Sequence, residues 1–179
     1  HKVGWVALHA AIAGGADIVL LPEIPYDIDV IVDAINKRKK AGKRFTIIAV
    51  AEGAISKKDA KLSKKELKEK QEKHKYPSVA YEMAEKVQKR TDQEVRIAVP
   101  GHTQRGGSPC PYDRVLSTRL GSAAAEAILD GDFGHMIGIR NDKVVRVPLS
   151  EVAGKLKYVD PQSDIIKEAK LSGISFGDK

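Results

Sequence analysis

The stretch Pro100-Gly-His-Thr-Gln-Arg-Gly-Gly-Ser-Pro-Cys-Pro-Tyr-Asp-Arg114 decides how the chain is organised. It follows a strand-like run, residues 94–99, with apolar side chains at alternate positions, and precedes a helical run, residues 115–129. Open α/β folds hold anions on loops of this kind, between the carboxyl end of a strand and the start of a helix. A structural loop needs the glycines and prolines but not the histidine, glutamine and arginine, so the stretch indicates a binding site.

The rest of the chain predicts strands that alternate with helices. Residues 17–22 and 45–50 are short apolar runs, typical of strands covered on both faces. Asn141-Asp142 indicates a hairpin turn between strands at 136–139 and 144–147. Helices are expected at 3–13, apolar almost all round and therefore buried, and at 28–41, 79–90, 149–156 and 163–171. The predicted fold class is α/β, a parallel, helix-covered, Rossmann-like sheet with a terminal antiparallel hairpin, and the residues from Gly173 onward are expected to fray.

Length and cysteine content narrow the class of protein. A chain of 179 residues is large enough for one domain with a proper core. The single cysteine, Cys110, excludes an internal disulfide and fits a reducing compartment, so a cytoplasmic location is expected. No apolar run approaches the length of a membrane span, and no membrane partner is expected.

The net charge of +7 is concentrated in one segment. Residues 57–75 hold nine lysines and four acidic residues, which accounts for +5 of it. This lysine-rich segment, residues 57–75, contains no arginine and no Phe, Trp or Tyr; the first such aromatic residue after the start of the segment is Tyr76. A surface that stacks on bases usually supplies aromatic side chains. The segment is interpreted as a solvated, partly helical insertion, and nucleic acid is not an expected partner. An anion-binding or nucleic-acid-binding module that uses the segment stays open as the alternative.

Two further residues are candidates by position. Glu52 follows the apolar run 45–50, and ligands of open α/β sheets bind at that end of a strand. A capping or solvated carboxylate is the other interpretation of Glu52. Arg96 lies in the strand-like run before the central loop, where it either contributes a cation to a site or points to solvent.

The central loop resembles a known signature. Gly101-His102-Thr103-Gln104-Arg105-Gly106-Gly107-Ser108-Pro109, with Tyr112-Asp113-Arg114 after it, is similar to the sugar-phosphate-binding signature of 6-phosphofructokinases. Two stretches agree with it, Gly4-Trp5 through Asp17 to Pro22-Glu23, and Val50-Ala51-Glu52-Gly53. The resemblance runs from residue 4 to about 147 and implies a C-terminal, substrate-binding domain over 1–179, with a lysine-rich insertion at 55–77 and a C-terminal tail at 160–179.

The resemblance implies a ligand and a role for each candidate. His102 and Arg105 would bind the phosphate of fructose 6-phosphate, and Glu52 would bind the sugar hydroxyls. Arg96 would reach the phosphate from the adjacent subunit, which implies a homo-oligomer. These residue types suit the task, because arginine is the best planar partner of a phosphate and a carboxylate can fix hydroxyls.

The resemblance also implies a reaction whose machinery lies elsewhere. The family transfers a phosphoryl group from ATP or pyrophosphate, assisted by Mg²⁺, to fructose 6-phosphate and yields fructose 1,6-bisphosphate in glycolysis. The glycine-rich nucleotide loops and the Thr-Ile-Asp-Asn-Asp motif of such transferases have no counterpart here. No catalytic or metal-binding residue is therefore expected in this stretch, which would depend on an N-terminal nucleotide-binding domain and be inactive alone.

A regulatory site is implied only in part. Asp17 and Lys43 match the residues that bind effectors in bacterial members of the family, but Ala41 stands where another lysine is usual. Regulation by a nucleoside diphosphate is therefore left open.

Overall fold

The computed structural model describes residues 2–72 and 75–179, which divide into two compact units. Of the described residues, 2–72, 75–99 and 157–179 form the first unit, and 100–156 form the second. The elements of the first unit are α1 (Trp5–Ala13), β1 (Ile18–Leu20), α2 (Ile28–Lys40), β2 (Ile48–Val50), η1 (Asp59–Lys61), α3 (Lys64–Glu72), α4 (Val79–Gln88) and α7 (Asp164–Leu171). Those of the second are η2 (Gly101–Arg105), α5 (Pro111–Leu129), β3 (His135–Arg140), β4 (Lys143–Pro148) and α6 (Leu149–Val152).

The sheet of the first unit is built on β1. Its three residues are fully buried, as the continuous apolar run predicts, and it pairs in parallel with β2, Ile18 opposite Ile48. On its other side, Val19 N–H donates to Ser175 O (2.9 Å). This parallel pairing, with the antiparallel hairpin of the second unit, confirms the predicted α/β class. β2 is shorter and less buried than expected, because Phe45 and Ile47 are exposed.

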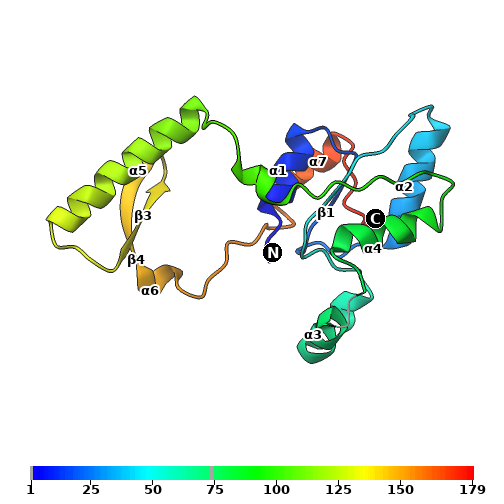
Figure 1. Cartoon of the computed structure of the whole chain (residues 1–179), viewed down its shortest axis with the longest axis horizontal. Helices are drawn as coiled ribbons and strands as arrows, with labels where there is room; N and C mark the ends of the chain where they lie inside the picture. The colour runs from blue at the N-terminus through cyan, green and yellow to red at the C-terminus, as the bar shows by residue number, and fades with distance from the viewer. Residues whose placement is uncertain (1, 73–74) are drawn as a thin grey trace. The chain divides into compact units, whose positions relative to one another are not determined.

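Helices cover both faces of this sheet. One core cluster joins α1 and α7 to Val19 of β1 and to Leu21 just after it, and Figure 1 shows these two helices close together. The second cluster joins Ile18 and Leu20 to side chains of α2 and α4 on the opposite face. Alternation of side chains along a strand explains why neighbouring residues of β1 enter different clusters.

Glycines end the helices as the sequence predicts. After α1, Gly15 has φ +65°, and the N–H of Ala16 donates to the carbonyl of Ala11 (2.8 Å). Gly42 closes α2 in the same way, with φ +76° and the N–H of Lys43 donating to Arg38 O (3.0 Å). This hydrogen-bond pattern places one residue in the left-handed region, which glycine adopts without a steric penalty.

Four detailed predictions are wrong. The helix expected at 149–156 is only the single turn α6, which ends at Val152. α1 buries only one face, and its Val6 is 70% exposed, so an apolar helix is not buried all round. Residues 94–99 form no strand. The chain after Gly173 does not fray, because Phe176 is 1% exposed within the first core cluster and Ser175 N–H donates to Asp17 O (2.9 Å).

The lysine-rich segment contains η1 and α3, in agreement with a partly helical insertion. Ser63 and Glu66 form a capping box at the start of α3, since the N–H of Ser63 donates to Glu66 Oε2 (2.8 Å) and the N–H of Glu66 donates to Ser63 Oγ (3.3 Å). Lys73 and His74 of this segment lie outside the described residues.

The second unit packs α5 against the β3–β4 hairpin (Figure 1). Asn141 and Asp142 both have positive φ (50° and 60°), which is the backbone of a two-residue hairpin turn and confirms that prediction. Arg146 of β4 donates to Asp130 (2.7 Å) and Asp132 (3.0 Å), which follow α5, so one guanidinium ties the end of the helix to the hairpin. These hydrogen bonds, that to Asp130 first, raise the pKa of Arg146.

Candidate functional site

The central loop begins with a short 3₁₀ helix. η2 spans Gly101–Arg105, with Gly101 at φ +52°, and the loop continues through Gly107 at φ +90°. Side chains three positions apart on a 3₁₀ helix lie on the same face. His102 and Arg105 have that spacing, so η2 presents an imidazole and a guanidinium together.

Both side chains are available to a ligand. His102 and Arg105 are exposed, and neither forms a hydrogen bond or ion pair with any residue in the described part of the chain. By contrast, Arg119 and Arg146 of the same unit pair with aspartates. A cation without an internal partner can bind an incoming phosphate without first breaking an ion pair.

α5 begins four residues earlier than the sequence predicts. Pro111 occupies the first position of α5. Proline is favoured there because the backbone N–H at that position has no acceptor within the helix, so nothing is lost when proline lacks it. Cys110 N–H donates to Asp113 Oδ2 (2.9 Å), and this bond lowers the pKa of Asp113. Arg114 Nε donates back to Pro109 O (3.3 Å). The Tyr112-Asp113-Arg114 part of the motif therefore fixes the end of the loop on the helix.

The other two candidates lie in the first unit. Glu52 is exposed, two residues beyond the carboxyl end of β2, as its position in the sequence predicts. Arg96 is exposed on the extended segment 93–99, and its Nε donates to Glu94 Oε1 (3.0 Å). Two of the four candidates, Glu52 and Arg96, thus lie in the first unit, and the other two lie in the second.

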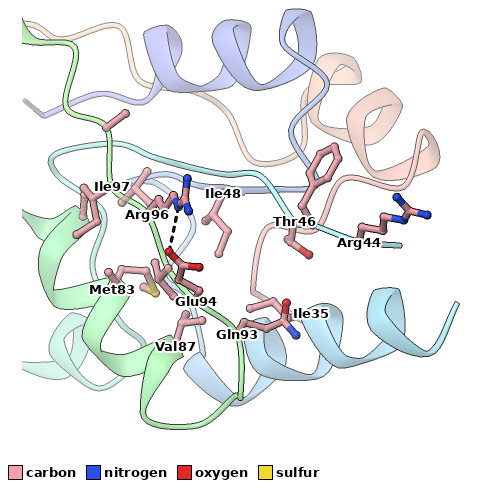
Figure 2. A pocket seen from close by; sticks show the side chains of 16 residues that line it. Ile35, Arg44, Thr46, Ile48, Met83, Val87, Gln93, Glu94, Arg96 and Ile97 are labelled. Atoms are coloured by element: carbon pink, nitrogen blue, oxygen red, sulfur yellow. Dashed lines mark hydrogen bonds and ion pairs between the residues drawn. The ribbon is translucent and has the colours of Figure 1, made fainter. Parts of the chain in front are cut away.

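A cavity of about 450 Å³ lies beside Arg96, and Figure 2 shows it with the Arg96–Glu94 bond dashed. Its apolar lining comes from α2, β2 and α4 and from the extended segment, and includes Ile35, Ile48, Met83, Val87 and Val95. Arg44 and Arg96 are its two cationic lining residues. Sequence analysis did not single out Arg44, which precedes β2 and carries no motif.

The two effector candidates have different surroundings. The Asp17 carboxylate accepts from Arg38 (2.8 Å) and from the N–H of Ile47 (2.8 Å), so both of its oxygens are engaged. Lys43 is exposed in the turn after α2. Asp17 therefore joins β1, α2 and the approach to β2 in this structure.

Glu23 is a structurally important carboxylate that sequence analysis passed over. Its Oε1 accepts from the N–H groups of Gly4 and Val159, both at 3.0 Å, and thereby joins the start of α1 to the C-terminal part of the chain. Its Oε2 is buried without a hydrogen-bond partner among the described atoms. Like Glu52, it follows a strand of the parallel sheet, and that position after an apolar run was the signal available in the sequence.

Two kinds of feature are not found in residues 2–72 and 75–179. No group of three or more His, Cys, Asp or Glu side chains there could hold a metal ion. No helix in the same ranges has the length and apolar character needed to cross a membrane.

The fold and the loop define a class, an α/β protein that presents cations between an extended segment and a helix. Comparison with known families identifies it. The phosphofructokinase family model matches residues 1–128, more than half of the chain, and the chain belongs to that family.

Relatives of both donor types are similar to this chain. An ATP-dependent 6-phosphofructokinase of Spirochaeta thermophila is 49% identical over 99% of this chain and 49% of its own length. A pyrophosphate–fructose 6-phosphate 1-phosphotransferase of Amycolatopsis methanolica is 42% identical over 90% of this chain and 47% of its own length. The chain thus spans about half the length of these curated relatives.

Solved structures agree with the assignment. Phosphofructokinase of Pichia pastoris in the T-state matches with a TM-score of 0.61 and 33% identity, over 83% of this chain and 16% of that one. A pyrophosphate-dependent phosphofructokinase from Marinobacter aquaeolei matches with a TM-score of 0.71 over 92% of this chain and 41% of that one, and at 21% identity it supports the fold alone.

Proposed function

We propose that the chain is the fructose 6-phosphate-binding part of a 6-phosphofructokinase. The observation that carries the proposal is that His102 and Arg105 lie on one face of η2 without a partner among the described residues, within the stretch that matches the family model. A phosphate dianion takes two or three charge-assisted hydrogen bonds, and a guanidinium supplies two in one plane. In this proposal Glu52 accepts hydrogen bonds from the sugar hydroxyls.

Titration calorimetry with fructose 6-phosphate tests this assignment. Arg105→Ala removes the planar cation and is expected to weaken binding about 10- to 100-fold, as the loss of a charge-assisted pair would. Arg140→Ala is the matched control, because Arg140 is an exposed arginine of the same unit that pairs with no described residue. Equal affinities of the two variants would remove Arg105 from the site.

The donor and its metal ion belong to the same proposal. ATP or pyrophosphate would supply the phosphoryl group, since relatives named for each donor match the chain. Mg²⁺ would assist the transfer, and no described residue is assigned to it. The residues of this chain would bind and orient the sugar phosphate, and no catalytic base is assigned among them. Phosphoryl transfer from either donor by the 179-residue chain alone would contradict this division of labour.

We also propose that Arg96 completes the site of a neighbouring subunit in a homo-oligomer. Arg96→Ala and Arg105→Ala chains are each expected to bind poorly. In a mixed oligomer, the Arg96→Ala subunit still has Arg105, and the Arg105→Ala subunit still has Arg96. Where the two meet, one site contains both arginines and can bind the ligand again. Recovery of binding on mixing would support the shared site, and strictly additive loss would place Arg96 in its own subunit's site.

The nucleic-acid alternative gains no support. Relatives are named for sugar-phosphate chemistry, and Lys57 and Lys70 already contact Asp178 O (3.0 Å) and Asp59 (2.5 Å). The proposed sugar-phosphate site uses no lysine of this segment. Charge reversal at Lys64 and Lys65 is therefore expected to leave the affinity for fructose 6-phosphate unchanged. Tight oligonucleotide binding that falls steeply with salt, and is lost in this variant, would revive the alternative.

A further inference from the structure

Glu52 lies in a tight turn that follows β2. The N–H of Ala54 donates to the carbonyl of Ala51 (2.9 Å), so Glu52 and Gly53 are the two central residues of a β-turn. Ala51 is 9% exposed and Ala54 is 5% exposed, whereas Glu52 is exposed. The backbone that carries the Glu52 carboxylate is therefore fixed, and the carboxylate itself is open to a ligand.

Both ends of this turn are hydrogen-bonded to β1 and to the residues after it. Before the turn, Ala51 N–H donates to Leu20 O (2.9 Å). After the turn, the N–H of Tyr26 donates to Ile55 O (3.1 Å), and the N–H of Lys57 donates to Tyr26 O (2.7 Å). These two bonds form an isolated parallel bridge. Both backbone groups of Tyr26 are thus used to hold the residues that follow the turn.

The side chain of Tyr26 is held by its surroundings. It is 3% exposed and belongs to the second core cluster. Its Cβ packs close to Gly177, because a Cβ built at that glycine would lie 3.1 Å from it, and the N–H of Asp27 donates to Gly177 O (2.7 Å). The Lys86 ammonium lies 5.9 Å from the centroid of the ring and interacts with the hydroxyl. A ring packed on several sides leaves the backbone of Tyr26 little freedom to move.

We propose that Tyr26 is a positioning residue for Glu52. The buried ring fixes the backbone of Tyr26, this backbone fixes the residues after the turn, and the turn holds the Glu52 carboxylate ready for the hydroxyl groups of the ligand. A carboxylate that is held in this way loses little conformational freedom on binding, which favours affinity. The effect on the ligand rests on the proposed function, because it requires that Glu52 binds the sugar hydroxyls, whereas the effect on the turn does not.

Residue-resolved amide hydrogen exchange of the full chain tests the effect on the turn without a ligand. Tyr26→Leu keeps an apolar side chain but removes the ring, and we expect the amides of Ala54 and Lys57 to exchange at least about tenfold faster. The amide of Ala51 donates to Leu20 O and should keep its rate. Unchanged rates at Ala54 and Lys57 would overturn the proposal. An equal increase at all three positions would overturn it too, since it would show general destabilisation.

Tyr26→Phe and Ile35→Ala are the controls. Tyr26→Phe keeps the ring and loses only the interaction of the hydroxyl with Lys86, so Ala54 and Lys57 should stay protected. Ile35→Ala leaves a cavity elsewhere in the same core cluster, since Ile35 is 4% exposed on α2. If either control loosened the turn as much as Tyr26→Leu does, the Tyr26 ring would have no specific role.

Titration calorimetry tests the consequence for Glu52. Tyr26→Leu is expected to weaken binding of fructose 6-phosphate about 3- to 10-fold and to leave the affinity for inorganic phosphate unchanged, because inorganic phosphate has no sugar hydroxyls. In a Glu52→Ala background, Tyr26→Leu should cause no further loss, since two substitutions that act through one carboxylate are not additive. Losses that multiply, or an equal loss of affinity for inorganic phosphate, would show that Tyr26 does not act through Glu52.

The two measurements separate this inference from the proposed function. If the turn keeps its protection in Tyr26→Leu while Glu52→Ala weakens binding of fructose 6-phosphate, the proposed function stands and the role of Tyr26 is wrong. If the turn loosens while Glu52→Ala leaves that affinity unchanged, Glu52 does not bind the sugar hydroxyls, and the positioning role fails with it.

Discussion

Two extended segments flank the β1–β2 sheet, and they differ in how they are held. The C-terminal residues 174–177 lie beside β1, with backbone bonds from Ser175 to both Asp17 and Val19 and with Phe176 buried in the core. Residues 93–99 lie toward β2 and form no such bonds with described residues. The second has the longer apolar alternation in its sequence, yet only the first is paired, so pairing follows anchoring contacts rather than alternation alone.

The largest expected effect comes from the anchor of the C-terminal segment. Phe176→Ala is expected to lower the free energy of unfolding by about 3–5 kcal/mol, because it removes a fully buried aromatic side chain and leaves a cavity. Val99→Ala, in the segment near β2, should change it by less than about 0.5 kcal/mol. Urea denaturation measures both. Similar losses for the two variants would mean that Val99 is as well packed as Phe176, and the contrast between the segments would fail.

A smaller effect is expected from the backbone of the same anchor. Gly177 has φ +68°, and a Cβ there would lie 3.1 Å from Ile31 Cγ1 and from Tyr26 Cβ. Gly177→Ala should therefore destabilise the protein by about 2–4 kcal/mol, through strain together with overpacking.

Gly173→Ala is the control for Gly177→Ala. Gly173 also has positive φ (+95°) but open space around its Cβ position, so backbone strain alone should cost about 1–2 kcal/mol. Thermal unfolding followed by circular dichroism gives the difference. A Gly177→Ala variant no less stable than Gly173→Ala would show that the C-terminal segment can move aside.

Asp17 lies just before β1 and connects it to α2 and to the residues that precede β2. Asp17→Ala removes the ion pair with Arg38 and the bond from Ile47 N–H, and is expected to cost about 1.5–3 kcal/mol. Asp33→Ala, an exposed aspartate on α2, should cost much less. A shift of the urea midpoint no larger for Asp17 than for Asp33 would argue that these contacts are weak in solution.

The smallest effect concerns the start of α5, which belongs to the second unit. The bond from Cys110 N–H lowers the pKa of Asp113 below its ordinary value of 3.8. A carboxylate with a lowered folded-state pKa stabilises the fold above its unfolded pKa, and this contribution is lost as the pH falls through the folded-state value. Asp113→Asn should therefore flatten the loss of helical circular dichroism below about pH 4. An unchanged acid transition would show that the cap contributes little.

Local signals predicted much of the fold correctly. Apolar runs and glycines located β1, α2 and α7, and Asn141-Asp142 located the hairpin, because each depends on a short stretch of chain. Predictions failed where a distant contact decides the outcome. Val6 is exposed because no described element packs on that side of α1, and Phe176 is buried because it joins the first core cluster, most of whose members are far from it in sequence.

The candidate site divides in the same way. The sequence by itself determined that His102 and Arg105 share a loop between an extended run and a helix, and its motif placed the chain in its family, because residue type and spacing are local properties. Only the tertiary structure decided that Arg105 has no partner among the described residues, that Arg96 pairs with Glu94 beside a cavity, and that Glu23 joins Gly4 to Val159. These facts depend on which segments meet in space, and such meetings are set by packing and hydrogen bonding across the whole fold rather than by any one stretch.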